Sequence, residues 1–432
     1  MDQSYMKKDK ILPLLLKMAL PMVISMMVNS LYNIVDSLFV AKLSENAMTA
    51  LSLVFPVQNL INSVMVGFGI GINSLISFYM GAQNNKMANK AASQGMFLAT
   101  IHGVIFTVVS IIIMPSFLKL FTSDTDVINL GVQYSNIAFA FSVILAWELV
   151  FEKTFQAVGR MKVSMVCMMT GCIVNIVLDP IMIFGIGFIP AMGIQGAALA
   201  TGIGQTTCAI MYLVLYKLRP IPVKYKRQYI KFEKGICGKL YSVGIPASLN
   251  MALPSLQVSV LNIILSSYSQ VYVFILGVYY KLQTFLYLPA NGVVQGMRPL
   301  IGYNYGAGEH KRVHKIYNTA LALVVAIMAV GTILCLSIPT KLIALFTINT
   351  DTINIGAIAL RIISAGFIVC CIIWRIRGTW KRYAITYYFT LQICNYNASG
   401  SIYSKSYIWS KWSLERLLGN RAYKCYYSSY TI

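Results

Sequence analysis

Charged side chains are scarce in this sequence of 432 residues. Only 11% of the residues are Asp, Glu, Lys or Arg, whereas a soluble domain typically carries about 25%. Hydrophobic residues make up 57% of the chain, and its mean hydropathy is +0.68. A soluble protein with this composition has too few polar side chains to cover its surface. The composition therefore excludes a soluble enzyme, a nucleic-acid-binding module and a disordered chain, and it predicts an all-α polytopic membrane protein.

Several motifs of enzymes and metalloproteins are missing as well. The nine cysteines form no C-x-x-C pair, so the sequence predicts no metal centre of that kind. No G-x-x-x-x-G-K-[ST] motif occurs, which leaves ATP-driven transport without support. The glycine-rich run Gly67–Gly71 follows no predicted strand and lies inside an apolar segment, so it indicates close helix packing and not a nucleotide loop. We therefore expect neither an enzyme nor a bound cofactor.

The chain contains long hydrophobic runs separated by short polar segments. A membrane helix needs about 20 mostly apolar residues. The runs predict spans at about 12–40, 48–80, 93–118, 128–152, 163–188, 194–216, 240–266, 271–304, 317–340 and 353–373. The Lys and Arg residues between them gather on one side, at the N-terminus and around residues 86–90, 153–162, 217–239 and 311–315. The positive-inside rule places that side, and the N-terminus, in the cytoplasm. The net charge of +22 thus indicates a multi-pass protein of the cytoplasmic membrane that contacts lipid and no nucleic acid.

The second half of the sequence repeats the first at a constant offset of 225 in the numbering. Residues 120–131 read L-F-T-S-D-T-D-V-I-N-L-G and residues 345–356 read L-F-T-I-N-T-D-T-I-N-I-G, so eight of these twelve positions are identical. The same offset pairs residues 21 and 246, 58 and 283, 67 and 292, 71 and 296, and 81 and 306 without any gap. This regularity indicates a duplication.

The duplication predicts the architecture. Each repeat should contain six spans, and because six is even, both repeats enter the membrane in the same direction. We expect two parallel-repeat six-helix bundles: an N-terminal lobe at 1–216, a basic cytoplasmic linker at 217–239, and a second lobe that begins at residue 240. Of the twelve expected spans, about ten are present as apolar runs.

Residues 374–432 do not supply the last two spans. The segment holds four of the five tryptophans and ten tyrosines, and it has no apolar run of spanning length. A Trp codon read one base later always encodes Gly, and a Tyr codon read one base later encodes Ile, Met or Thr. A frameshift near residue 374 therefore converts this Trp- and Tyr-rich segment into two apolar spans. We interpret 374–432 as an out-of-frame tail, natural or from a sequencing error, after an incomplete four-span lobe at 240–373. A genuine basic cytoplasmic tail is the alternative.

Four acidic residues lie inside predicted spans, where a charge is costly: Asp36, Glu148, Glu152 and Asp179. Asp36 is on the first span, and Asp179 is on the fifth, one helical turn after Asn175. Thr201 on the sixth span adds a hydroxyl group. Carboxylates, an amide and a hydroxyl can hold a proton or a desolvated Na⁺, because hard cations prefer oxygen ligands. The alternative is that Asp36 and Asp179 only bond to neighbouring backbone groups.

Other polar residues of the spans receive separate interpretations. Glu152 adjoins Lys153 near the end of the fourth span, so we expect a solvated ion pair at the membrane surface, with Glu148 one turn earlier. Lys281 and Arg298 of the eighth span either face a central cavity or extend to the membrane surface. The residues predicted to line a substrate cavity are Gln58, Gln283, Lys281 and Arg298.

Taken together, several motifs resemble the multidrug and toxic compound extrusion (MATE) family. They include A-L-P-M-V-I-S-M-M-V-N-S-L-Y-N-I-V-D at 19–36, G-I-Q-G-A-A-L-A-T at 193–201 and G-M-R-P-L-I-G-Y-N-Y-G-A-G at 296–308, and the resemblance covers residues 11 to about 373. It implies a cation-driven antiporter with two six-helix lobes that exports bulky amphipathic, often cationic compounds. It also implies that Asp36, Asn175, Asp179 and Thr201 form the first-lobe cation site of one bacterial or archaeal branch.

We therefore expect a monomer that exports drugs or toxic metabolites in exchange for H⁺ or Na⁺, with Na⁺ held by Asp36, Asn175 and Asp179. Two alternatives stay open. One is a lipid-linked saccharide flippase of the same wider fold, which would need several basic residues facing the cavity. The other is a non-functional, truncated transporter that lacks its last two spans.

Overall fold

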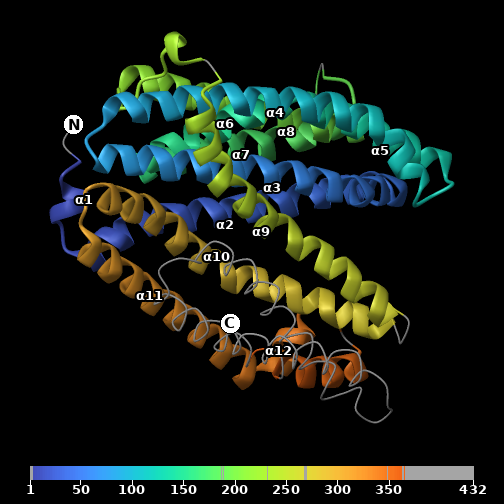
Figure 1. Cartoon of the computed structure of the whole chain (residues 1–432). Helices are drawn as coiled ribbons and strands as arrows, with labels where there is room; N and C mark the ends of the chain where they lie inside the picture. Colours follow the sequence, from blue (N-terminus) through green and yellow to red (C-terminus); the bar gives the residue numbers. More distant parts are fainter. Residues whose placement is uncertain are drawn as a thin grey trace, which may run out of the picture. The chain divides into compact units, whose positions relative to one another are not determined.

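The computed structural model describes residues 3–361 and 364, except residues 186, 188, 231, 267–269 and 348. Within these residues the chain forms helices and no strand (Figure 1). They are α1 (Tyr5–Lys8), α2 (Ile11–Leu43), α3 (Glu45–Gly81), α4 (Asn85–Lys119), α5 (Thr125–Ala140), α6 (Ser142–Ala157), α7 (Met161–Phe184), α8 (Ile194–Leu218), a 3₁₀ turn (Arg227–Tyr229), α9 (Lys234–Ser266), α10 (Gln270–Gly306), α11 (His310–Ser337) and α12 (Pro339–Ala344). The predicted all-α class is confirmed.

The helices divide between two compact units. The first unit comprises Met1–Ser255 and Tyr287–Val324, and the second comprises Leu256–Leu286 and Val325–Ile432. The first unit thus joins α1–α8 to the first part of α9, the last part of α10 and the first half of α11. In the second unit the Thr332 hydroxyl donates a hydrogen bond to the Ser364 carbonyl oxygen at 3.3 Å.

Six helices of the described residues are long and apolar enough to cross a membrane: α2, α3, α4, α7, α8 and α11. The single span expected at 128–152 is instead two helices, α5 and α6, bent by 44°. Thr107 donates a hydrogen bond at 2.8 Å to the Phe139 carbonyl oxygen next to the break, and such an inserted side chain bends a helix. The tenth expected span at 353–373 lies mostly outside the described residues, and the tail at 374–432 lies wholly outside them.

The repeated L-F-T motif caps a helix in each repeat. The Asp124 carboxylate accepts hydrogen bonds from the backbone N–H groups of Asp126 and Val127 at the start of α5. Asn349, the counterpart of Asp124 in the second repeat, accepts the same two bonds from Asp351 and Thr352. Because four N–H groups at a helix start lack helical partners, this side-chain cap explains why the motif is repeated.

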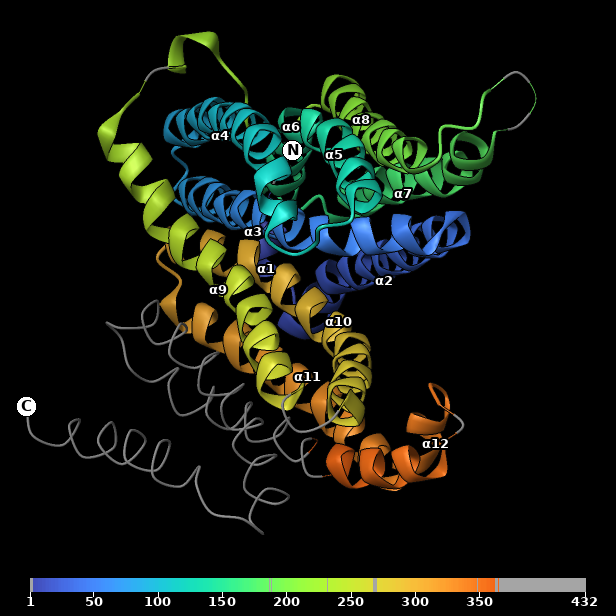
Figure 2. The ribbon, with the colours of Figure 1, turned by 90° about the vertical axis from the view of Figure 1, so that its right-hand side faces the viewer.

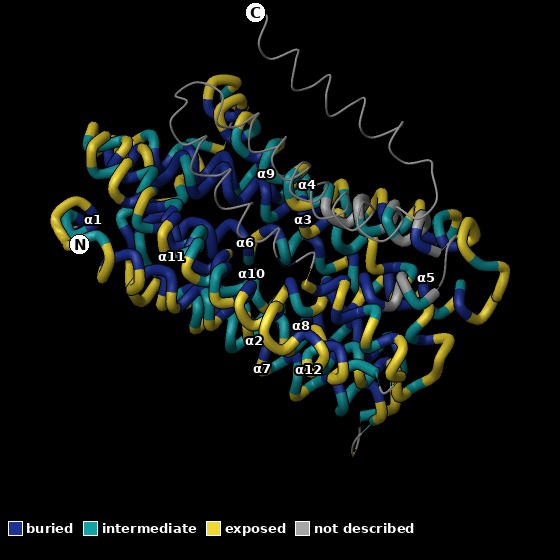
Figure 3. Tube along the Cα trace, turned by 90° about the horizontal axis from the view of Figure 1, so that it is seen from below, coloured by how far each residue is buried: buried dark blue, intermediate teal, exposed yellow. Residues whose placement is uncertain are grey.

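The bundle of α2–α8 is held by close helix pairs within the first unit. Helix α7 packs against both α8 and α2 (Figure 2). Glycines allow α7 and α8 to approach closely. A Cβ at Gly171 would lie 2.9 Å from the Gly204 carbonyl oxygen, and a Cβ at Gly204 would lie 2.8 Å from the Gly171 carbonyl oxygen. Buried and exposed positions alternate along the helices (Figure 3). The exposed apolar side chains include Leu38 and Ile112, which are available to lipid.

The short helix α1 is fastened to turns of both repeats within the first unit. Met6 is fully buried, and its carbonyl oxygen accepts a hydrogen bond from the Asn304 amide at 3.1 Å. Lys7 forms a 2.9 Å ion pair with Glu309. At the α6–α7 turn, Gly159 has φ +78°, and a Cβ there would overlap Tyr5 and Met6. The lysine beside Glu309, with its hydrogen bond, holds the pKa of that exposed carboxyl below its usual range.

We expect Gly159→Ala to undock α1. Alanine at a positive φ costs about 1 kcal/mol by itself, and the overlap with Tyr5 and Met6 should raise the total to roughly 3 kcal/mol. Gly187→Ala is the matched control, since Gly187 has φ +66° and no neighbour within 4 Å. The measurement is thermal unfolding of the full chain in detergent; equal losses for the two variants would show that the packing of α1 contributes nothing.

Candidate functional site

The four residues predicted to bind a cation are all buried in the first unit. Asp36 comes from α2, Asn175 and Asp179 from α7, and Thr201 from α8. The Asn175 amide nitrogen donates hydrogen bonds to Asp179 Oδ1 at 3.1 Å and to Thr201 Oγ1 at 3.4 Å. Asp179 is fully buried, and Asp36 is 8% exposed. The structure therefore brings Asn175, Asp179 and Thr201 into one hydrogen-bonded group, with Asp36 in electrostatic range of Asp179.

Three oxygen atoms of this group are buried without a hydrogen-bond partner among the described residues: Asp36 Oδ1, Asn175 Oδ1 and Asp179 Oδ2. Buried polar atoms of native proteins are nearly always bonded, so each exception points to a missing partner. Oxygen atoms that accept and do not donate are what a proton or Na⁺ requires. The alternative that the two carboxylates only bond to neighbouring backbone does not account for these free oxygens.

Two tyrosines belong to the same region and were not predicted. The Tyr134 side chain of α5 is buried and lies in electrostatic range of both carboxylates. Tyr32 of α2 also lies in electrostatic range of Asp36 and Asp179. Tyr32 precedes Asp36 by one helical turn, a spacing that could have identified it from the sequence. No local pattern marks Tyr134, because only the packing of α5 against the bundle brings it there.

The ion pair of Glu152 and Lys153 is buried, so its expected place at the membrane surface is wrong. The Lys153 ammonium lies 2.8 Å from Glu152 Oε1, and the two side chains are 5% and 6% exposed. Gln156 completes the group, accepting from Lys153 at 3.3 Å and donating to Glu152. The expected span ended at residue 152, but α6 continues to Ala157, which keeps the pair inside the bundle.

Helix α3 provides the space for this ion pair. The Asn73 amide donates a hydrogen bond at 3.0 Å to the Lys153 carbonyl oxygen. A Cβ at Gly69 would lie 2.9 Å from Cγ of Lys153, so the lysine stem rests on the bare backbone of that glycine. One turn before the pair on α6, Glu148 has a buried Oε2 without a hydrogen-bond partner among the described residues. The glycine run of α3 thus packs helices closely, as predicted.

The residues predicted to line a substrate cavity are distributed over both units. Gln58 and Arg298 belong to the first unit, whereas Lys281 and Gln283 belong to the second. The Lys281 ammonium lies 5.9 Å from the centroid of the Phe346 ring within that second unit. The cavity itself stays a prediction.

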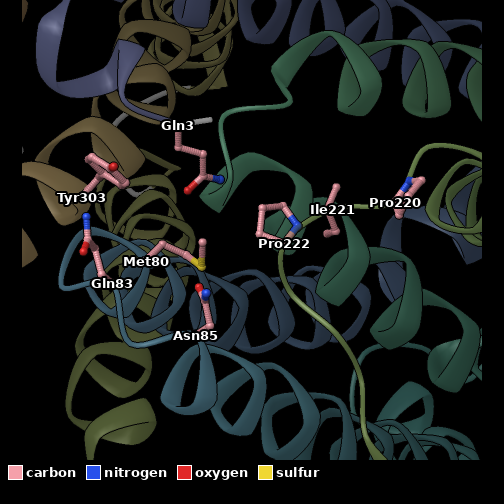
Figure 4. Close-up of a pocket in the computed structure, with 8 residues that line it drawn as sticks. All are labelled: Gln3, Met80, Gln83, Asn85, Pro220, Ile221, Pro222 and Tyr303. Atoms are coloured by element: carbon pink, nitrogen blue, oxygen red, sulfur yellow. The ribbon is translucent and has the colours of Figure 1, made fainter. Parts of the chain in front are cut away.

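A different cavity of about 640 Å³ opens within the first unit. The labelled side chains converge from four places: the N-terminus, the α3–α4 turn, the segment that follows α8, and helix α10 (Figure 4). They are Gln3, Met80, Gln83, Asn85, Pro220, Ile221, Pro222 and Tyr303. None of the predicted site residues lies in it, so this cavity is separate from the buried carboxylates.

Fold and site together define a duplicated, polytopic helical membrane protein with a buried group of carboxylates. The sequence profile of the MatE family matches residues 21–181 and 246–390, two segments whose starts are separated by the offset of the internal repeat. The chain belongs to the MatE family, and it is a multi-pass protein of the cell membrane.

Known relatives share much of the chain. The multidrug export protein MepA of Staphylococcus aureus (strain MSSA476) is 25% identical over 359 residues, which cover 83% of this chain and 78% of that protein. MepA of Staphylococcus haemolyticus (strain JCSC1435) is 23% identical over the same length. A crystal structure of MATE in complex with MaL6 aligns with TM-score 0.80 and 20% identity over 93% of this chain and 87% of that one. A MOP superfamily transporter from Pyrococcus furiosus aligns with TM-score 0.79 and 20% identity over 93% and 96%. These structures share the fold.

We expect Lys153→Met to destabilise the protein strongly. It leaves the Glu152 carboxylate buried without its partner, and breaking a buried ion pair in this way costs about 3–5 kcal/mol. The double variant Glu152→Gln/Lys153→Met should regain most of that loss. Lys90→Met is the control, because the Lys90–Glu233 pair is partly exposed and contributes roughly 1 kcal/mol or less. Unfolding in detergent gives the comparison, and similar losses for Lys153→Met and Lys90→Met would contradict the buried pair.

Proposed function

We propose that this protein exports bulky amphipathic, often cationic compounds from the cell in exchange for H⁺ or Na⁺. Membership of the MatE family and the two staphylococcal relatives, both named multidrug export proteins, support multidrug efflux. One observation carries the cation coupling: Asp36 and Asp179 lie in electrostatic range of each other with free, buried oxygen atoms.

The charge balance of the first unit supports a mobile cation. The ion pairs of the described residues are Lys7–Glu309, Lys90–Glu233 and Lys153–Glu152. None of them includes Asp36 or Asp179, although Lys153 is buried in the same bundle. Two buried carboxylates without a fixed cation are unfavourable, so a proton or Na⁺ from solution is the group that balances them.

Binding of this cation can act on helix packing because the two carboxylates belong to different helices. Asp36 is on α2 and Asp179 is on α7, and these helices pack against each other. A bound cation removes the repulsion between them, and its release restores it. The cation shifts an equilibrium between two states of the transporter only by its difference in affinity for them, and a change from 1:99 to 99:1 needs about 10⁴-fold.

The two candidate ions use the site differently. A proton needs only a carboxylate oxygen, whereas Na⁺ also uses neutral oxygen ligands, here Asn175 Oδ1 and Thr201 Oγ1. Asn175→Ala should therefore weaken Na⁺-driven export more than H⁺-driven export.

We expect Asp36→Asn to abolish export while the protein is still made and inserted. The amide keeps the size of the side chain but cannot take up a proton or balance a cation. The measurement is dye efflux from cells, followed by dye transport in vesicles with an imposed pH or Na⁺ gradient. Asp126→Asn makes the same chemical change at an exposed residue of α5 and should leave export intact.

Three outcomes decide the proposal. Export by the parent chain that is lost in Asp36→Asn and kept in Asp126→Asn supports it. Parental export by Asp36→Asn would contradict cation coupling at this site. A parent chain that is inserted but moves no dye would contradict the efflux function and favour the non-functional product.

A further inference from the structure

Glycines at equivalent positions of the two repeats make reciprocal contacts within the first unit. A Cβ at Gly81 of α3 would overlap the carbonyl oxygen of Tyr303 on α10. A Cβ at Gly306 of α10 would overlap the carbonyl oxygen of Phe78 on α3. The offset of the repeat makes Gly306 the counterpart of Gly81 and Tyr303 the counterpart of Phe78. The two contacts are therefore the same contact made in both directions.

Between these two contacts, one position meets its own counterpart. A Cβ at Gly302 would overlap the hydroxyl oxygen of Ser77, and the offset of the repeat pairs these two residues with each other. Contact of a surface with its own equivalent is the property of a two-fold interface. A pseudo-two-fold axis therefore passes between α3 and α10 at Ser77 and Gly302.

The same reciprocity continues farther along the helices. A Cβ at Gly67 of α3 would overlap Ser248 of α9, and a Cβ at Gly292 of α10 would overlap Val23 of α2. Val23 and Ser248 are again counterparts in the two repeats. The Ser248 hydroxyl also donates a hydrogen bond to the Val64 carbonyl oxygen at 3.2 Å.

One turn nearer the cytoplasm a second pair repeats this arrangement. A Cβ at Gly71 would lie 2.6 Å from the Leu240 carbonyl oxygen, and a Cβ at Gly296 would lie 2.7 Å from the Ala19 backbone nitrogen. From Gly67 to Gly81 the contacts follow α3 for about 21 Å, at about 1.5 Å per residue. This length exceeds half of a hydrocarbon core of about 30 Å.

We propose that these contacts form a glycine seal, which closes the cytoplasmic ends of the two repeats and must separate whenever a substrate enters from the cytoplasm. The seal consists of Gly67, Gly71, Gly81, Gly292, Gly296, Gly302 and Gly306. This inference rests on the proposed transport function. The side is set by charge, because α3 and α10 both end next to the basic turns of residues 86–90 and 311–315.

The chemistry of the seal suits a contact that opens and closes repeatedly. Glycine lets two backbones approach closely, and such small-residue contacts hold membrane helices by packing. Close-packed contacts of this kind are lost abruptly on separation, because dispersion falls steeply with distance. At the glycines themselves the contacts are packing contacts, with one hydrogen bond beside them from Ser248 to Val64. The polar contacts of α1 with Asn304 and Glu309 also join the two repeats at this end, so they have to break together with the seal.

Spin labels at Lys86 and Lys311 would measure the state of the seal. Both residues are exposed, and they occupy equivalent positions of the repeats beside the ends of α3 and α10. Attaching the labels through an unnatural ketone amino acid leaves the native cysteines unlabelled. Electron–electron resonance on the full chain in lipid vesicles then gives the distribution of distances between the labels.

The decisive variant is Gly302→Ala, with rescue by a swap. A methyl group at residue 302 overlaps the Ser77 side chain, so we expect a shift to longer distances, with the closed-to-open ratio reduced about tenfold. In Ser77→Gly/Gly302→Ala the nearest remaining atom to the new Cβ is the Phe78 nitrogen at 3.5 Å, an ordinary contact. The swap should restore the parental distribution. Gly238→Ala is the control, since nothing lies within 4 Å of a Cβ there.

An unchanged distribution in folded Gly302→Ala, or a swap that restores nothing, would overturn the seal. If Gly302→Ala does not fold, Gly71→Ala and Gly296→Ala replace it, and the pseudo-symmetry requires that both shift the distances alike. The distance readout needs no substrate. A parent without export but with the expected shifts therefore contradicts the efflux function alone, and export without the shifts contradicts the seal alone.

Discussion

The cost of an unbalanced charge in an apolar interior governs how the first unit arranges its few polar groups. Lys153 is balanced by a neighbouring carboxylate and an amide, and its stem occupies space left by a glycine. Asp36 and Asp179 lie in the same bundle, and no ion pair among the described residues gives either of them a fixed cation. Since the chain can build a fixed ion pair in this interior, the open carboxylates support the proposal that an ion from solution balances them.

Part of this arrangement follows from sequence and part of it does not. The four-residue spacing of Asn175 and Asp179 predicts a shared helix face, and the structure joins them by a hydrogen bond. Thr201 lies beside Asn175 because glycines let α8 pack closely against α7. No local sequence pattern reveals this helix contact. Hydropathy places Lys153 too near the membrane surface because the apolar run ends at residue 152, whereas α6 continues one turn farther.

Duplication was the strongest signal in the sequence, and the structure shows what it preserves. The Asp124 and Asn349 caps keep one turn in both repeats because helix N–H groups need acceptors. The paired glycines keep close contacts in both repeats, because a side chain on either copy would push the backbones apart. The sequence shows that these positions are equivalent. It does not show that the two copies meet each other, since that depends on the packing of distant helices.

Helix α3 connects the two features. Gly69 faces Lys153 on α6, whereas Gly67 and Gly71, about 200° away around the helix, face α9. Neither face of this short segment has side chains that could adjust by changing rotamer. Under the proposed cation coupling, a displacement of α6 or α2 would therefore move the α3 backbone itself. Contacts between bare backbones respond to such a displacement by separating, and in this way a local change at a buried carboxylate can reach the seal without a continuous chain of polar groups.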